Sequence, residues 1–199
     1  MHVRGTPGSG KSCLAQSLYH HLRSQKKKTI LLLGWHSESP AEDFLASACQ
    51  GRGWSVTRDN VGDSDVTFII DEAQMCYNDS GLWGGIMKFQ SMRKFGAQFC
   101  LFSAYGSAVT GPSPNYQQST PLYFTPNQRM SLTASPNEAS PEISLFYNTS
   151  EYTDLINRYC GQGTVEFEMA HDIRDYVFLL GNGHPGATAS VLDYIRKVR

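Results

Sequence analysis

The residues with the clearest chemical purpose form one short glycine-rich segment. They read Gly5-Thr6-Pro7-Gly8-Ser9-Gly10-Lys11-Ser12 and match the pattern G-x-x-x-x-G-K-[ST] at every fixed position. Glycines let successive backbone N–H groups turn toward one anion, and a following helix adds the positive end of its dipole. We therefore predict that this loop binds the phosphates of a nucleotide, with the contacts continuing to Cys13.

Two side chains of this loop have roles of their own. Lys11 is predicted to reach the β and γ phosphates as a mobile point charge and so to assist catalysis. The Ser12 hydroxyl is predicted to be a ligand of the Mg²⁺ ion that bridges these phosphates. Mg²⁺ and a nucleotide are thus the expected cofactors.

A pair of carboxylates follows an apolar, β-branched stretch at positions 66–70. In parallel sheets ligands bind beyond the carboxyl ends of the strands, so Asp71 is expected to hold Mg²⁺ through its water shell. Glu72 would face the γ phosphate, where it could orient and deprotonate the attacking water. The alternative is a strand-end turn that carries two solvated acids, which the presence of the phosphate-binding loop makes less attractive.

Other polar residues have weaker claims to the same site. Ser103 ends the next apolar strand and is a candidate sensor of the γ phosphate, or only a turn residue. Arg129 is a second candidate sensor, with a surface arginine as the alternative. Gln74 is a further candidate without an assigned task.

Strand-like and helix-like segments alternate along most of the chain. Strands are expected near 2–3, 29–33, 66–70, 99–103 and 128–132, and helices at 12–24, 40–49, 82–95, 151–160 and 184–198. The apolar strands between helices indicate a parallel sheet covered on both faces. Residues 1–135 would form this core, 106–126 a surface loop or lid, and 136–199 a helical lid-like segment.

The bulk composition narrows the class of protein. The chain has 199 residues, 17 basic and 18 acidic, and a net charge of -1, so charge does not predict nucleic-acid binding. No apolar run is long enough to cross a bilayer. Five scattered cysteines indicate reduced thiols and an intracellular location, in cytoplasm or nucleus. The very short first strand leads us to expect a fragment of a longer polypeptide.

The motifs together resemble those of the AAA+ and STAND ATPases. The resemblance is carried by the T-P-G-S-G-K-S loop, the D-E-A-Q strand end, the Phe102-Ser103 strand and the late segment Gly183-His184-Pro185-Gly186. Within that class the phrases I-I-D-E-A-Q-M, L-F-S-A-Y-G-S and N-G-H-P-G are similar to NTPase modules of fungal and oomycete Crinkler-type proteins.

This resemblance implies a three-layer fold around a five-stranded parallel sheet of order 5-1-4-3-2, a helical lid, and ATP as the nucleotide. It also implies that His184 and Pro185 touch the base or ribose, although a proline at a helix start is common for capping reasons alone. The absence of an N-K-x-D guanine motif agrees with adenine.

Three functions remain open. The first is an ATPase module that switches or drives an attached effector or signalling domain, with possible self-association. The second is an interaction module that binds nucleotide without turnover. The third, a helicase-like fragment suggested by D-E-A-Q, is disfavoured because no second sheet domain is visible.

Overall fold

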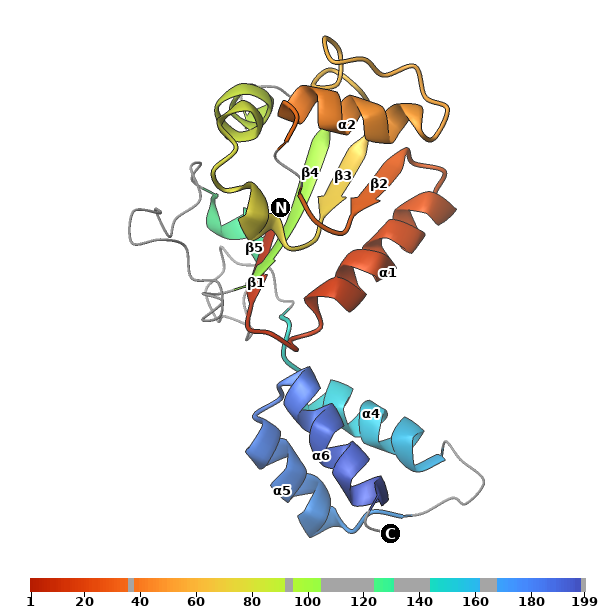
Figure 1. Ribbon diagram of the computed structural model, residues 1–199. Helices are drawn as coiled ribbons and strands as arrows, with labels where there is room; N and C mark the ends of the chain where they lie inside the picture. Colours follow the sequence, from red (N-terminus) through yellow and green to blue (C-terminus); the bar gives the residue numbers. More distant parts are fainter. Residues whose placement is uncertain (36–37, 92–94, 105–123, 131–143, 162–167, 198–199) are drawn as a thin grey trace.

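A computed structural model describes residues 1–35, 38–91, 95–104, 124–130, 144–161 and 168–197 (Figure 1). The strands are β1 (His2–Gly5), β2 (Thr29–Leu32), β3 (Thr67–Ile70), β4 (Gln98–Ala104) and β5 (Arg129–Met130). The helices are α1 (Lys11–Ser24), α2 (Ala41–Gln50), α3 (Lys88–Ser91), α4 (Thr149–Gly161), α5 (His171–Gly181) and α6 (Pro185–Lys197). The predicted lid at 106–126 lies almost entirely outside the described residues.

The five strands form one parallel sheet in the order β2-β3-β4-β1-β5. From the other edge this reads 5-1-4-3-2, so the predicted order is confirmed. Short β1 is paired over its whole length, with His2 opposite Leu101 and Gly5 opposite Ala104 of β4. A parallel arrangement brings all the carboxyl ends to one edge, where the loop after β1 and the acids after β3 must emerge.

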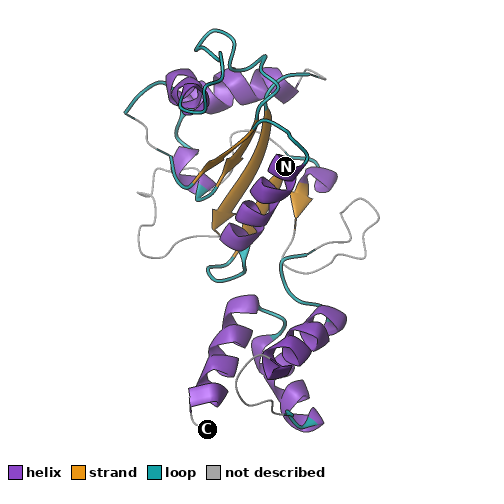
Figure 2. Cartoon of the chain, turned by 90° about the vertical axis from the view of Figure 1, so that its right-hand side faces the viewer, coloured by secondary structure: helices purple, strands orange, loops and turns teal. Residues whose placement is uncertain are grey.

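Side chains that alternate along the strands serve two separate cores. On one face Ile69 and Phe102 pack with Ala15 of α1, and Figure 2 shows α1 lying across that face. On the other face Phe68 and Leu101 pack with Leu45 of α2 and with the π-helical segment Gly81–Met87. Apolar residues on both faces of each strand require cover on both sides, and the predicted three-layer arrangement around a parallel sheet is confirmed.

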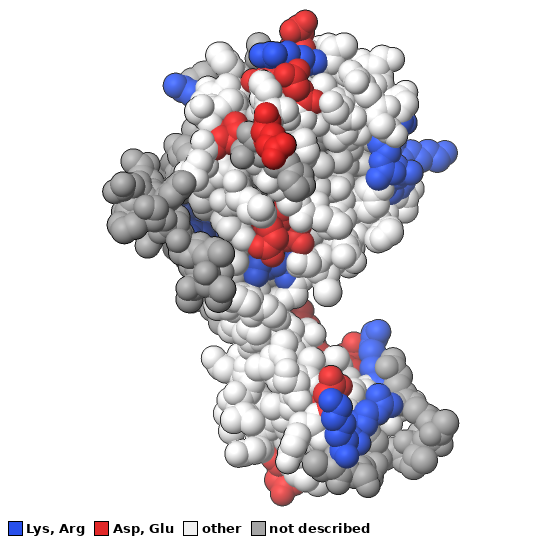
Figure 3. All heavy atoms as spheres, in the orientation of Figure 1, with Lys and Arg blue, Asp and Glu red and all other residues white. Residues whose placement is uncertain are grey.

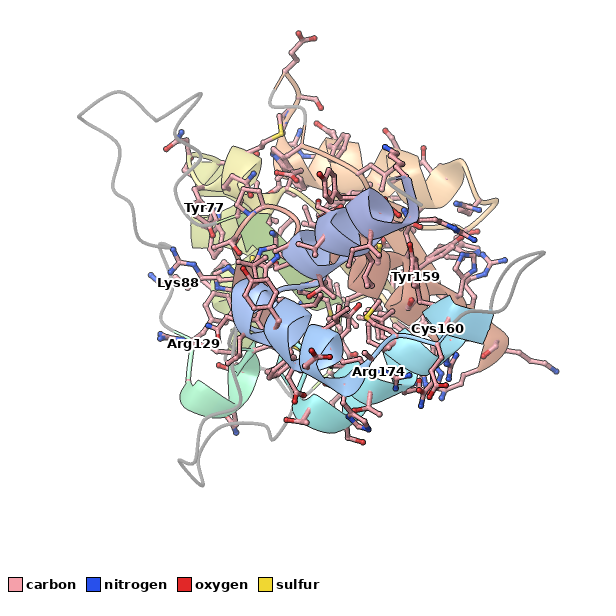
Figure 4. The ribbon with its side chains drawn as sticks, turned by 90° about the horizontal axis from the view of Figure 1, so that it is seen from below. Tyr77, Lys88, Arg129, Tyr159, Cys160 and Arg174 are labelled. Carbon is pink, nitrogen blue, oxygen red and sulfur yellow. The ribbon has the colours of Figure 1, made fainter. Side chains whose placement is uncertain are left out.

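Helices α4, α5 and α6 form a third cluster beyond the carboxyl ends of the strands (Figure 1). Tyr152 and Ile156 of α4 pack there against Val177 of α5 and Leu192 of α6. Tyr159 closes the group through a 2.7 Å hydrogen bond from its hydroxyl to the carbonyl oxygen of Leu192. Figure 4 looks at the molecule from this side and shows Tyr159, Cys160 and Arg174 among the three helices.

Two expectations about helices were wrong in detail. Helix α5 was not predicted, although Ile173, Tyr176, Val177 and Leu180 recur at helical spacing; of these four side chains only Val177 is buried. The helix expected at 82–95 is a π-helical turn over Gly81–Met87 that continues into α3, and residues 92–94 are outside the described part. Among the described helices, none combines the length and apolarity needed to cross a membrane.

Candidate nucleotide-binding site

The glycine-rich loop connects the end of β1 to the start of α1. Gly8 and Gly10 have φ values of 74° and 86°, a region that other residues adopt only with strain, so their lack of a side chain shapes the loop. Gly10 directly precedes the helix. The backbone N–H groups of Lys11, Ser12 and Cys13 open the first turn, where α1 offers them no carbonyl oxygen. In the described part of the chain, none of the three donates to another backbone carbonyl.

Lys11 is folded back over the loop and is almost completely buried. Its ammonium group donates to the carbonyl oxygens of Gly5 at 3.1 Å and Thr6 at 2.7 Å, and lies 3.5 Å from the Ser9 hydroxyl. These contacts hold the positive charge inside the turn of the loop. A phosphate group placed there would meet both the charge and the free N–H groups.

Asp71 and Glu72 lie at the end of β3, as the sequence predicted. The backbone N–H of Asp71 bonds to Leu32 at the end of β2, at 2.8 Å, so the acid is held by the sheet. Asp71 is buried, and its carboxylate accepts the N–H of Glu72 at 3.1 Å. Glu72 itself is in the left-handed region, with φ 53° and ψ 40°, which is uncommon for a residue with a side chain.

The sheet brings the loop and the acids to one edge with only β4 between them, and the pKa of Lys11 agrees with that arrangement. Burial lowers this pKa from its ordinary value, while the negative charges of Glu72 and Asp71 oppose the shift. The two carboxylates are therefore close enough to Lys11 to act on its charge. The tertiary structure thus brings together the three side chains that the sequence assigned to one site.

The oxygen donors at this edge suit a hard divalent cation. Ser12 is exposed at the start of α1 and offers a hydroxyl, and Asp71 offers a buried carboxylate. Mg²⁺ prefers a few such oxygen ligands together with water and phosphate oxygens. The residues therefore fit Mg²⁺, which would neutralise phosphate charge when bound; its coordination stays a prediction.

Ser103 takes part in a buried hydrogen-bond network. Its side chain is fully buried, and its hydroxyl lies 2.8 Å from His2 Nε2 and 3.0 Å from the Tyr77 hydroxyl, which donates to it. Burial, followed by the charges of Arg4, the N-terminal amine and Arg129, lowers the pKa of His2 to about 3. The neutral imidazole can therefore accept the Ser103 proton. The network joins β1 to β4, and the sensor role of Ser103 stays a prediction.

Arg129 lies in β5 and pairs with His2 of the neighbouring strand β1. His2 is three residues before Gly5, where the phosphate-binding loop begins. Figure 4 shows Arg129 and Tyr77 on one side of the molecule, away from Arg174 and Tyr159. The charge of Arg129 acts on His2, as the pKa of that residue reports. A contact between Arg129 and phosphate also stays a prediction.

The late segment Gly183-His184-Pro185-Gly186 rests directly against the phosphate-binding loop. His184 Nε2 is 3.1 Å from the Thr6 hydroxyl and 3.1 Å from the carbonyl oxygen of Pro7. Its Nδ1 accepts the N–H of Ala187 at 3.2 Å, which indicates that Nε2 carries the proton. Pro185 begins α6. The contact of His184 and Pro185 with a base or ribose stays a prediction.

Sequence reasoning gave too little weight to Gln74. Its amide contacts Glu72 on one side and Ala104, the last residue of β4, on the other. Its place two residues after Glu72, in D-E-A-Q, was the only signal available in the sequence.

Surface charge indicates no competing binding site on the face shown in Figure 3, where Lys and Arg side chains lie in small groups interspersed with Asp and Glu.

No family model matches the chain, and no curated protein is similar to it. Among solved structures, that of AMPPCP-bound DnaA from Aquifex aeolicus is similar, with a TM-score of 0.49 and 14% sequence identity. The match covers 98% of this chain and 54% of the DnaA chain, so the present chain spans about half of that length. What the site does must therefore be inferred from its own residues.

Proposed function

We propose that the chain binds a Mg²⁺-nucleoside triphosphate, with ATP preferred, and hydrolyses its terminal phosphoanhydride bond. The observation that carries this proposal is that the phosphate-binding loop follows β1 while Asp71 and Glu72 follow β3, at one edge of a parallel sheet in which only β4 separates the two strands. A phosphate-binding loop alone would support binding. A second carboxylate beside it adds a group that can act on water.

Each residue then has a defined task. The loop from Gly5 to Cys13 surrounds the phosphates, and Lys11 neutralises charge on the β and γ groups. The Ser12 hydroxyl would bind Mg²⁺ directly, and the Asp71 carboxylate would hold it through its water shell. Glu72 takes a proton from the attacking water while the oxygen of that water bonds to the γ phosphorus. The bond between the γ phosphorus and the bridging oxygen breaks, and the nucleoside diphosphate leaves. Most of the rate enhancement would come from positioning and charge neutralisation.

We further propose an AAA+/STAND-like module, with residues 1–135 as the core and 136–199 as the lid-like segment. The strand order and the contact of His184 with the loop support this assignment. Its nucleotide state would switch or drive a fused effector or signalling domain, or control self-association. The Crinkler-type relationship is proposed on the phrases in the sequence alone, and an intracellular location on the reduced cysteines.

The test is a titration of the protein with ATP and GTP in the presence of Mg²⁺, followed by a phosphate-release assay. We expect tighter binding of ATP, and turnover that falls by about a hundredfold or more in Glu72→Gln while ATP binding persists. Glu168→Gln, an exposed carboxylate of the helical segment, is the matched control.

The possible results separate the candidate functions. No affinity for either nucleotide would overturn the whole proposal. ATP binding without turnover in the unmodified protein would favour the non-hydrolysing interaction module. Turnover that survives in Glu72→Gln would remove the assignment of the base, and turnover that depends on added DNA or RNA would revive the helicase-like reading.

A further inference from the structure

The side-chain amide of Gln74 is bonded in two directions. Its Oε1 accepts the backbone N–H of Ala104 at 3.1 Å, and its Nε2 donates to Oε2 of Glu72. The orientation of the amide is unambiguous, because a backbone N–H only donates and a carboxylate only accepts. Gln74 thus connects a fixed point of the backbone to the proposed base.

The fixed point belongs to the most central part of the site. Ala104 ends β4, and in the sheet register it lies opposite Gly5, where the phosphate-binding loop begins. The pairing of β4 with β1 extends to Ala104, whereas its pairing with β3 ends at Leu101, so at Ala104 the side toward β3 is left to Gln74. A group tied to Ala104 is therefore held at a constant place relative to the loop.

Glu72 needs such a support. Its backbone is in the left-handed region, and its side chain is half-buried rather than packed in a core. A free glutamate side chain at such a position samples several rotamers. Gln74 occupies Oε2, and among the described residues no hydrogen bond reaches Oε1. One carboxylate oxygen is held while the other can face a water molecule.

We infer that Gln74 is a positioning residue for hydrolysis, which aims the Glu72 carboxylate by tying it to the end of β4. The inference rests on the proposed function, in which Glu72 is the base. Gln74 makes or breaks no covalent bond and takes no proton. Its effect is expected on kcat and not on nucleotide affinity, because among the described residues its side-chain hydrogen bonds go to Glu72 and Ala104 and none to the phosphate-binding loop.

Two variants separate positioning from simple bracing of the turn at Ala73–Cys76. Gln74→Met keeps the length of the side chain and loses both hydrogen bonds. Gln74→Glu keeps an acceptor for Ala104 but cannot donate to Glu72. Gln98→Met is the matched control, because Gln98 is an exposed glutamine at the start of β4, the end of the strand opposite Ala104.

The experiment measures kcat and KM for Mg²⁺-ATP, the Kd for ATP and the thermal midpoint of each full-length variant. We expect both Gln74 variants to lose about tenfold to a hundredfold in kcat, as is usual for residues that orient a reacting group. Their Kd should stay within about twofold of the unmodified value, because the phosphate-binding loop is untouched. A Glu72→Gln/Gln74→Met double variant should be no slower than Glu72→Gln alone, because residues that act as a unit are not additive.

Other results would overturn the inference in recognisable ways. An unchanged kcat in Gln74→Glu, while Glu72→Gln is inactive, would show that the base needs no support from Gln74. Loss of ATP binding together with a lowered thermal midpoint in both variants would show a structural brace. If Glu72→Gln itself retains turnover, the proposed function fails and the role of Gln74 falls with it.

Discussion

The backbone N–H of Gly186 donates a 2.9 Å hydrogen bond to the carbonyl oxygen of Gly8, and so joins the start of α6 to the phosphate-binding loop. His184 adds its bonds to Thr6 and Pro7 from the same turn. The helical segment therefore contacts the first half of the phosphate-binding loop directly. The backbone around His184 and Gly186 thus belongs to the helical segment and also contacts the phosphate-binding loop.

A side chain at position 186 should open this contact. A Cβ there would lie 2.8 Å from the carbonyl oxygen of Gly8 and 3.2 Å from its Cα, and backbone atoms cannot move aside cheaply. We expect Gly186→Ala to lose about 1–3 kcal/mol of unfolding free energy, although alanine favours a helix by about 1 kcal/mol. Urea unfolding and hydrogen exchange of the first turn of α6 are the measurements.

Gly161→Ala is the control for this change, because in the described part of the chain no atom lies within 4 Å of a Cβ at that helical glycine. It should be neutral or stabilising. Equal stability of the two alanine variants would contradict a tight contact between Gly186 and Gly8.

Removing the charge of Lys11 should abolish tight nucleotide binding. Lys11→Met keeps an apolar side chain of similar length but takes away the charge that lies over Gly5 and Thr6. We expect the Kd for Mg²⁺-ATP to rise by about a hundredfold, which corresponds to about 2.7 kcal/mol. Lys27→Met, at an exposed lysine after α1, should bind as the unmodified protein does. Equal loss in both variants would indicate a non-specific charge effect.

Asp71 should carry the dependence of binding on Mg²⁺. In Asp71→Asn the buried side chain still accepts the N–H of Glu72 but loses its negative charge. We expect ATP affinity in Mg²⁺ to fall to the level measured with EDTA, because a neutral amide is a poor ligand for this ion or its waters. Asp65→Asn removes an exposed carboxylate paired with Lys28 and should keep the response to Mg²⁺. A full response in Asp71→Asn would argue against the metal assignment.

Buried His2 should make the protein less stable as the solution is acidified. Its pKa is about 3 in the folded chain and 6.5 in its ordinary environment, so between these values the unfolded chain binds more protons. The contribution of neutral His2 to the free energy of unfolding is therefore fully present above about pH 6.5. It is lost as the pH falls toward 3, by roughly 1.4 kcal/mol per pH unit at most.

The measurement for His2 is urea unfolding at pH 7 and pH 5. His2→Gln keeps an acceptor for Ser103 but has no proton to bind, so its stability should change less between these pH values, by roughly 2 kcal/mol. Identical pH dependence in the two proteins would mean that His2 is protonated in the folded state as readily as in the unfolded chain.

The sequence alone determined the features that depend on neighbouring residues. The spacing of Gly5, Lys11 and Ser12 and the apolar run before Asp71 predicted a loop and an acidic strand end, and both lie where a parallel sheet places them. Alternating strands and helices likewise indicated the three layers. Helix α5 was missed even though Ile173, Tyr176, Val177 and Leu180 recur at helical spacing, and only packing against α4 and α6 shows that Val177 is the buried member of that set.

Contacts between distant positions came only from the tertiary structure. His184 is 178 positions from Thr6, and His2 is 101 positions from Ser103, so no local pattern could pair them. Gln74 can make its two hydrogen bonds, to Glu72 and Ala104, only because the sheet order brings the end of β4 beside the turn after β3. Local spacing selects which groups are present, while chain packing decides which of them meet.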